Sequence, residues 1–279
     1  MDIKDIALFA REGAPCAAQV SLAARLAHVH GARVAGVCLL VEPELPICDS
    51  YAIGREAVVA VLEDRDRAAR ASVAPIEIAL RQAAAEHDCG LDWTVVGPDE
   101  PLEASALRAR FADLVIVRRP PQGDGPAFDL ASALMLASGT PCLVVPDTAR
   151  TDGRFDRVLV AWNGSRDAKR ALDDGLALLL GASAVKVLII DGEAAAETDA
   201  GSVATLFAHL ARHGVHAELK RLRKAHEGVG KAILQEAETS SADLLIMGAY
   251  GHSRTSEAVF GGATRTVLSH APIPVLMSH

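Results

Sequence analysis

An internal repeat is the feature of this sequence that most constrains its fold. Each half of the chain opens with a short apolar run, at residues 5–10 and 157–162. Each run leads into an alanine-rich amphipathic stretch that ends at a glycine, Gly31 in the first half and Gly181 in the second. A repeat of this length has the size of a whole domain rather than of a solenoid unit. The chain therefore contains two similar units in tandem.

The spacing between matching positions locates the main difference between the halves. Gly31 and Gly181 lie 150 residues apart, whereas Asp113 and Asp243 lie 130 residues apart. The first half thus carries about twenty extra residues, and prolines followed by a long helical pattern place them within residues 42–71. We expect an extended loop and a lengthened helix in this region.

Both halves alternate strand-like and helix-like segments. The expected strands of the second half are residues 157–162, 184–190, 216–222, 243–247 and 273–277, and the expected helices are residues 166–180, 197–213, 227–239 and 263–270. Continuous apolar strands separated by helices indicate parallel pairing with helices on both faces of the sheet. We therefore expect an α/β fold of two tandem doubly wound domains, residues 1–147 and 156–279. Each would be an open, five-stranded, mainly parallel sheet of order 3-2-1-4-5.

In this strand order the fifth strand of each half, residues 142–145 or 274–277, lies at a sheet edge. An apolar edge strand that is left unpaired invites association with another strand. We expect these two edges to pair with each other inside one chain, or with another chain in a homodimer.

Composition narrows the classes of function. Half of the residues are hydrophobic, but no run approaches the roughly 20 apolar residues of a membrane span. The first residues also lack the basic and apolar regions of a signal peptide, so we expect a cytoplasmic protein with no membrane partner. The net charge of −8 argues against binding to nucleic acid, which needs a basic face. The five cysteines have no metal-ligand spacing, and we expect buried thiols.

A glycine pattern follows the fourth strand of the second half. Gly248 and Gly251 are separated by two residues, and after nine more residues Gly261 and Gly262 precede a short helical run. Glycines allow positive φ and let backbone N–H groups approach phosphate oxygens, and a following helix adds free N–H groups at the positive end of its dipole. Strand, glycine loop and helix in this order predict an anion cradle at the switch point of the sheet. The alternative is a loop that only turns the chain.

This spacing resembles the signature of the universal stress protein family, Gly-x2-Gly-x9-Gly-Ser/Thr, which wraps the phosphates of ATP. The resemblance implies ATP or another adenine nucleotide as ligand, with Mg²⁺ as an accompanying ion. Two positions depart from the family's nucleotide binders. Gly262 replaces Ser or Thr and removes a hydroxyl donor to the terminal phosphate, although Thr264 offers one nearby. Asn163 replaces Asp, so the carboxylate that would help to hold Mg²⁺ is lost.

The resemblance also assigns the individual site residues. By alignment, the adenine would lie against the strand ends at Ala161, Trp162, Ile189 and Met247, where Trp162 is large enough to reshape the pocket; the alternative is that these four are only core residues. The full nucleotide-binding set is Ala161, Trp162, Asn163, Ile189, Met247, Gly248, Gly251, His252, Ser253, Arg254, Gly261, Gly262, Ala263 and Thr264.

The matching place in the first half has a different character. Pro120 and Pro121 remove two N–H donors where a phosphate would bind. We expect Asp129 to cap the next helix and to fill the anion position with its own carboxylate. Arg118 and Arg119 could attract some other anion. We therefore expect one nucleotide site per chain, in the second half alone.

Neither a metal site nor a catalytic site is expected. His209, His213 and His216 lie close together in the sequence, but histidine is also at home near a helix C-terminus, and no acidic partner occurs at a suitable spacing. Efficient phosphoryl transfer needs a metal-binding carboxylate, and Asn163 stands in its place, so we expect at most a weak ATPase activity.

The sequence leaves two functions from different classes open. The first is a cytoplasmic universal stress protein whose adenine nucleotide acts as an occupancy signal in stress response. The second is a nucleotide-free interaction module that acts through protein partners.

Overall fold

A computed structural model describes residues 2–14, 16–40, 55–119, 127–190, 200–223, 228–249 and 262–279. The strands of the first half are β1 (Asp5–Arg11), β2 (Arg33–Leu39), β3 (Leu91–Val96), β4 (Leu114–Arg118) and β5 (Cys142–Val145). Its helices are α1 (Ala17–His30), α2 (Arg55–Glu86), α3 (Leu102–Leu107) and α4 (Ala127–Ser138).

The second half repeats this alternation. Its strands are β6 (Arg157–Trp162), β7 (Ala184–Ile190), β8 (Ala217–Leu222), β9 (Leu244–Gly248) and β10 (Val275–Ser278). Its helices are α5 (Arg166–Asp174), α6 (Leu176–Leu179), α7 (Ala200–Arg212), α8 (Val229–Thr239) and α9 (Gly262–His270).

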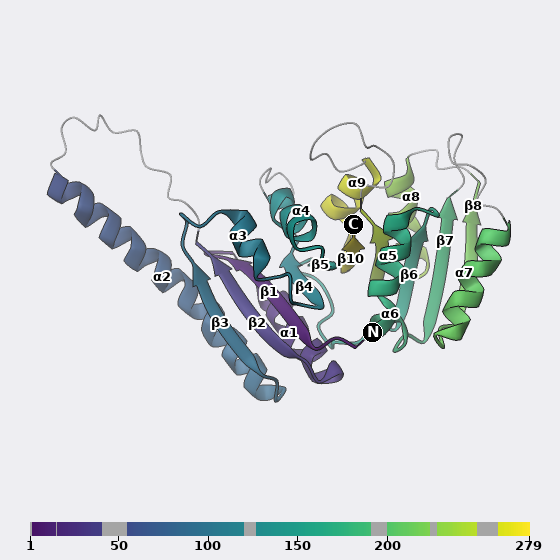
Figure 1. Ribbon diagram of the computed structural model, residues 1–279, viewed down its shortest axis with the longest axis horizontal. Coiled ribbons are helices and arrows are strands. Elements are labelled where there is room, and N and C mark those ends of the chain that lie inside the picture. Colours follow the sequence, from purple (N-terminus) through teal and green to yellow (C-terminus); the bar gives the residue numbers. More distant parts are fainter. Residues whose placement is uncertain are drawn as a thin grey trace.

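Ten strands in the described ranges form one continuous sheet, in the order β3-β2-β1-β4-β5-β10-β9-β6-β7-β8 (Figure 1). Each half contributes five parallel strands in the order 3-2-1-4-5, which confirms the predicted fold class. The halves meet where β5 and β10 pair antiparallel, with Leu276 opposite Leu143 and Met277 opposite Cys142. Of the two arrangements expected for the fifth strands, the structure has the pairing within one chain.

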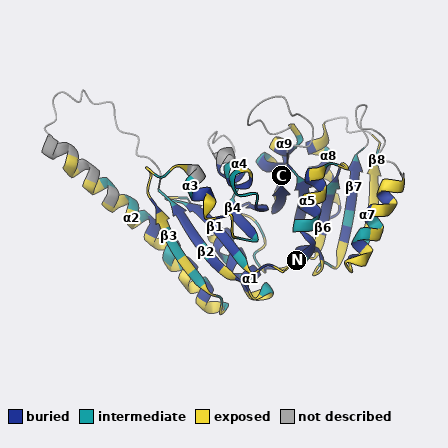
Figure 2. Ribbon diagram, viewed as in Figure 1, coloured by how far each residue is buried: buried dark blue, intermediate teal, exposed yellow. Residues whose placement is uncertain are grey.

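Helices cover both faces of this sheet, and the apolar residues between helices and sheet form two layers. We call the layer under α1, α2, α5, α6 and α7 the α1-side core, and the layer under α3, α4, α8 and α9 the α4-side core. Leu26 and Leu172 belong to the first, and Leu134 and Leu268 belong to the second. Each layer thus draws buried residues from both halves of the chain. Figure 2 shows the central strands buried and the outer faces of the helices exposed.

The lengthened element of the first half is a helix, as predicted. Helix α2 has 32 residues, whereas its counterpart α7 has 13. Figure 1 shows one end of α2 reaching beyond the sheet. The expected loop before α2, residues 41–54, lies outside the described residues.

Capping residues visible in the sequence mark two of the helix ends. Helix α1 ends at Gly31, which has a left-handed φ of 61°, and α5 begins after Ser165, whose hydroxyl accepts from the Ala168 amide. The single helix expected over residues 166–180 is a wrong prediction, because the chain breaks into α5 and α6 at Gly175. A Cβ at Gly175 would lie 2.7 Å from Ile246 Cδ1, so the glycine lets the helix lie close to the sheet.

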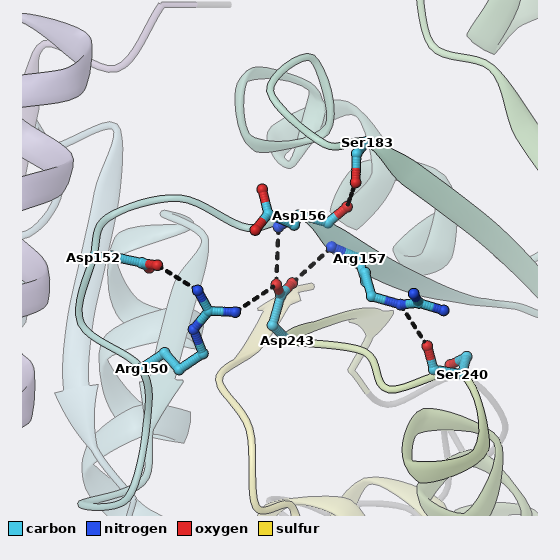
Figure 3. Close-up of polar contacts among 7 residues, drawn as sticks. All are labelled: Arg150, Asp152, Asp156, Arg157, Ser183, Ser240 and Asp243. Atoms are coloured by element: carbon cyan, nitrogen blue, oxygen red, sulfur yellow. Dashed lines mark hydrogen bonds and ion pairs between the residues drawn. The ribbon is translucent and has the colours of Figure 1, made fainter.

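The matching aspartates of the repeat do the same structural task in each half. Asp243 accepts from the backbone amides of Asp156 at 2.9 Å and Arg157 at 3.0 Å, at the start of β6 (Figure 3). Asp113 accepts from the amides of Lys4 at 2.7 Å and Asp5 at 3.0 Å, at the start of β1. These carboxylates fix the first strand of each half beside the fourth.

Cys38 and Cys142, which lie inside strands β2 and β5, are fully buried. Burial raises the pKa of the Cys38 and Cys142 thiols to about 12. Cys16 and Cys89 are partly exposed, and Cys48 lies outside the described residues. The buried pair thus behaves as small hydrophobic groups.

Candidate functional site

The candidate site begins with the turn from β6 into α5. The Ser165 amide donates to Asn163 Oδ1 at 3.0 Å, and Gly164 between them has a φ of +73°. Ser165 then caps α5 by accepting from the Ala168 amide at 3.1 Å. The side-chain oxygen of Asn163 is therefore used to shape this turn. The second lone pair of Oδ1 and the amide nitrogen are left to face a ligand.

Gly248, at the carboxyl end of β9, is needed for a reason other than the one predicted. Its φ lies outside the left-handed region, but a Cβ there would lie 2.5 Å from the Ala168 nitrogen and 2.6 Å from the Asp167 carbonyl carbon. Only glycine lets the first turn of α5 rest directly on β9. This contact brings the N-terminus of α5 to the carboxyl edge that was predicted to bind phosphate.

Helix α9 supplies the second N-terminus at this edge. Gly262 begins α9, and a Cβ there would meet no atom of the described residues within 4 Å, whereas Thr264 in the same turn is buried. The position of α9 is set by Gly230 of α8, where a Cβ would lie 2.6 Å from Thr266 Cβ and 2.9 Å from the Ala263 carbonyl oxygen. The first turn of α9 therefore presents backbone N–H groups that have no partner within the helix.

The four residues predicted to form the adenine wall do not share one face. Ala161 pairs in register with Met247, and both pack in the α4-side core. Trp162 pairs in register with Ile189, and both lie in the α1-side core. Successive residues of a strand point to opposite faces, so Ala161 and Trp162 are divided by the sheet itself. The structure thus brings these residues together as two pairs, with only their backbones at a common edge.

Five residues of the predicted set belong to the segment between β9 and α9. Gly251, His252, Ser253, Arg254 and Gly261 lie outside the described residues. The described members of the predicted set are Ala161, Trp162, Asn163, Ile189, Met247, Gly248, Gly262, Ala263 and Thr264. Met247 and Gly248 end β9, and Gly262, Ala263 and Thr264 begin α9. Ala161, Trp162, Asn163 and Ile189 lie on or directly after β6 and β7.

The first half has an internal ion pair at the equivalent edge. Arg118 donates from Nε to Asp147 Oδ1 at 2.8 Å and from Nη2 to Asp147 Oδ2 at 2.5 Å. These hydrogen bonds lower the pKa of Asp147. Arg119 donates to the Ser269 carbonyl oxygen of α9 at 2.8 Å, so it ties the two halves together. Both arginines were predicted to attract an external anion, and both have partners within the chain. Pro120 and Pro121, and the side chain of Asp129, lie outside the described residues.

The helical histidines make a side-chain contact of their own. The His209 and His213 rings lie edge to face with centroids 4.6 Å apart, and His209 Nε2 lies 3.2 Å from Asp173 Oδ1. Within the described ranges, no three His, Cys, Asp or Glu side chains gather closely enough to hold a metal ion. In the same ranges, no helix is both long and apolar enough to cross a lipid bilayer.

Sequence reasoning missed the glycines at close helix contacts. Gly175 lets α5 approach the sheet, and Gly230 lets α8 approach α9. A glycine inside an otherwise helical pattern is the signal that could have found them, because such a residue weakens the helix unless close packing requires it.

The sheet order and the paired helix N-termini define a doubly wound α/β protein with its candidate site at the switch point. Solved structures share this fold over nearly the whole chain. A universal stress protein of Archaeoglobus fulgidus superposes with a TM-score of 0.69 at 14% identity, covering 98% of this chain and 97% of that one. A putative universal stress protein of Pseudomonas aeruginosa superposes with a TM-score of 0.62 at 15% identity, covering 99% and 93%.

The sequence comparisons show which family the second half resembles. Residues 154–279 match the model of the Universal stress protein family. A universal stress protein of Synechocystis sp. is 33% identical over 141 residues, which cover 49% of this chain and 46% of that relative. The chain thus spans less than half the length of the curated relative that it matches. Residues 154–279 are thus similar to the universal stress protein family.

Proposed function

We propose that the second half of this chain binds an adenine nucleotide at the carboxyl edge of β6 and β9, and that the bound nucleotide signals in a cytoplasmic stress response. ATP, ADP and AMP are the candidate ligands, with Mg²⁺ as an accompanying ion. We also propose that residues 1–147 and 156–279 are separate universal-stress-like domains, of which only the second keeps the site.

One observation carries the proposal. The neighbouring strands β6 and β9 each lead toward a helix N-terminus at the same edge, and Gly248 holds the first turn of α5 against the end of β9. Helix N-termini favour anions through free N–H groups and through the dipole. Gly262 leaves space among the described residues at the start of α9, where a phosphate oxygen could approach the backbone.

The equivalent edge of the first half is less suited to bind a phosphate. Its edge already holds the Asp147 carboxylate, bound to Arg118 in a bidentate pair. A carboxylate beside the end of β4 repels a phosphate and occupies the nearby cation. One site per chain is therefore the expected stoichiometry.

The test uses Gly262 because a Cβ there would meet no atom of the described residues. Gly262→Asp places a carboxylate at the N-terminus of α9, which favours the helix but repels phosphate. Gly262→Asn is the matched control, since it has the same shape and no charge. We expect the Asp variant to bind ATP, ADP and AMP at least about tenfold more weakly than the Asn variant, with folding unimpaired.

Titration calorimetry on the full-length chain measures this difference, and circular dichroism checks the fold. Equal affinity of the Asp and Asn variants would show that no phosphate lies at α9. If the purified protein also releases no adenine nucleotide on denaturation and binds none, the nucleotide-free interaction module becomes the better function.

A further inference from the structure

An open groove of about 430 Å³ lies between α5 and α7, on the outer side of the second half. Trp162 and Leu206 line it and are buried in the α1-side core. The proposed nucleotide edge shares Trp162 and the turn from β6 into α5 with this groove, and it extends from there toward Met247 of the α4-side core. The groove therefore borders that edge on the α7 side, and its volume is that of a small-molecule site.

The rim of the groove is cationic, although the whole chain has a net charge of −8. Arg166 and Lys169 reach it from α5, and Arg212 reaches it from α7. Asp173 accepts a hydrogen bond from Lys169 Nζ, and its Oδ1 lies 3.2 Å from His209 Nε2. One carboxylate therefore contacts two basic side chains. The rim therefore keeps a positive excess.

The two arginines are the cations with most freedom to meet a ligand. Arg166 is 79% exposed, and its Nε lies 3.7 Å from Asp167 Oδ1, beyond hydrogen-bond distance. Arg212 is exposed and has no carboxylate in ion-pair contact among the described residues. Guanidinium groups bind phosphate through two parallel N–H bonds, which requires that their donors are not already used.

Trp162 and Leu206 form the apolar floor of the groove. Trp162 is 8% exposed, and its indole Nε1–H is buried without an acceptor in the described part of the chain. A buried polar group of this kind costs free energy unless a partner is supplied. Ser165 at the start of α5 and Ser202 of α7 add hydroxyl groups to the lining.

We propose that the groove between α5 and α7 is a second ligand site, which binds a small phosphate-bearing organic molecule. The phosphate lies between Arg166, Lys169 and Arg212, and the apolar part of the ligand lies over Trp162 and Leu206. Cations at the rim and an apolar floor select a ligand with both characters over an inorganic anion. The site borders the proposed nucleotide edge, and Arg212 on α7 belongs to the groove alone.

The probes are phenyl phosphate and inorganic phosphate, titrated against the full-length chain by calorimetry. We expect phenyl phosphate to bind more tightly, because its ring buries apolar surface on the groove floor. Arg166→Gln and Arg212→Gln should each weaken phenyl phosphate binding by about tenfold or more, since each removes a charge-assisted hydrogen bond. Lys220→Gln is the control, because Lys220 pairs with Leu188 of the α4-side core and so lies on the other face of the sheet.

Fluorescence locates the bound probe. The chain has two tryptophans, so Trp93→Phe leaves Trp162 as the single reporter. We expect a saturable change in Trp162 emission with phenyl phosphate that is lost in the two arginine variants and kept in Lys220→Gln. No saturable binding at millimolar probe would overturn the proposal. Binding that survives both arginine changes but is lost in Gly262→Asp would also overturn it, because the phosphate would then lie at α9.

Discussion

At the scale of single residues, two glycines of the candidate site have opposite surroundings. Gly248 lies against the backbone of α5, whereas a Cβ at Gly262, at the start of α9, would meet no atom of the described residues. Neither has a φ in the left-handed region. Their difference is therefore one of packing, and it separates a glycine that the fold needs from one that it tolerates.

This difference predicts different effects of an alanine substitution on stability at the two glycines. Gly248→Ala places a Cβ 2.5 Å from the Ala168 nitrogen, and helix backbone cannot move aside as a flexible side chain can. We expect a loss of about 1–3 kcal/mol, the usual cost of overpacking. Gly262→Ala, the matched control, meets no atom of the described residues and should leave stability unchanged or slightly higher. Urea denaturation measures both, and equal midpoints for the two variants would contradict the prediction.

The residue scale also shows what the sequence could and could not predict. Gly31 and Ser165 were predictable as caps because their chemistry is local. The role of Gly248 was not, because a helix almost eighty residues earlier in the chain makes the contact. The pairing of Arg118 with Asp147 was missed for the same reason, since it joins the ends of two strands that are neighbours only in the folded sheet.

At the scale of elements, that ion pair joins the end of β4 to the segment after β5. Gln19 of α1 adds a hydrogen bond from Nε2 to the Val145 carbonyl oxygen at 3.0 Å. The three contacts hold two strands and a helix at the edge where the second half is proposed to bind phosphate. The first half thus stabilises this edge with its own carboxylate.

The lowered pKa of Asp147 makes the stability of this edge depend on pH. The carboxylate stabilises the fold above the ordinary aspartate pKa near 4, and the contribution is lost as pH falls through the lower folded pKa. At pH 7 we expect Asp147→Asn to cost at most about 1 kcal/mol, because the Asp147 side chain is half exposed. The gap from the wild type should close below about pH 3.

Urea midpoints of the wild type and Asp147→Asn, measured between pH 7 and pH 2.5, test this prediction. The control introduces Asp147→Asn into a chain that already carries Arg118→Gln. In that background Asp147→Asn should have little pH-dependent effect, since the main donor is absent. A gap that stays constant to the lowest pH would mean that the pair does not contribute to stability.

The positions of helices and strands were predicted well wherever the hydrophobic pattern of the sequence was clear. The positions of β6, β7, β9 and β10 agree with their apolar runs, and the extra residues of the first half form part of α2. Strand β8 lies where a strand was expected, although its sequence AELKRL is mostly exposed. The failure was the single helix over residues 166–180. The break at Gly175 depends on Ile246 and Leu276 in the sheet beneath, and its local signal is the glycine itself within a helical pattern.

At the scale of the whole molecule, the two halves share both hydrophobic cores. The seam consists of β5 and β10, and fully buried residues such as Leu143 and Leu276 lie on either side of it in the α1-side core. Arg119 and Arg170 add side-chain hydrogen bonds between the halves, to the carbonyl oxygens of Ser269 and Gly139. An interface that continues the core of both partners couples their unfolding.

We therefore expect the chain to unfold in one cooperative transition. Trp93 in β3 reports on the first half and Trp162 in β6 on the second, so Trp162→Phe and Trp93→Phe each leave a single reporter. The two emission changes should share one urea midpoint and one slope, which is the usual test of two-state behaviour. Leu276→Ala, at the seam, should lower both midpoints together through a loss of about 2–5 kcal/mol. Separate midpoints, or an effect of Leu276→Ala on the Trp162 signal alone, would show that the halves fold as independent domains joined only by a weak edge.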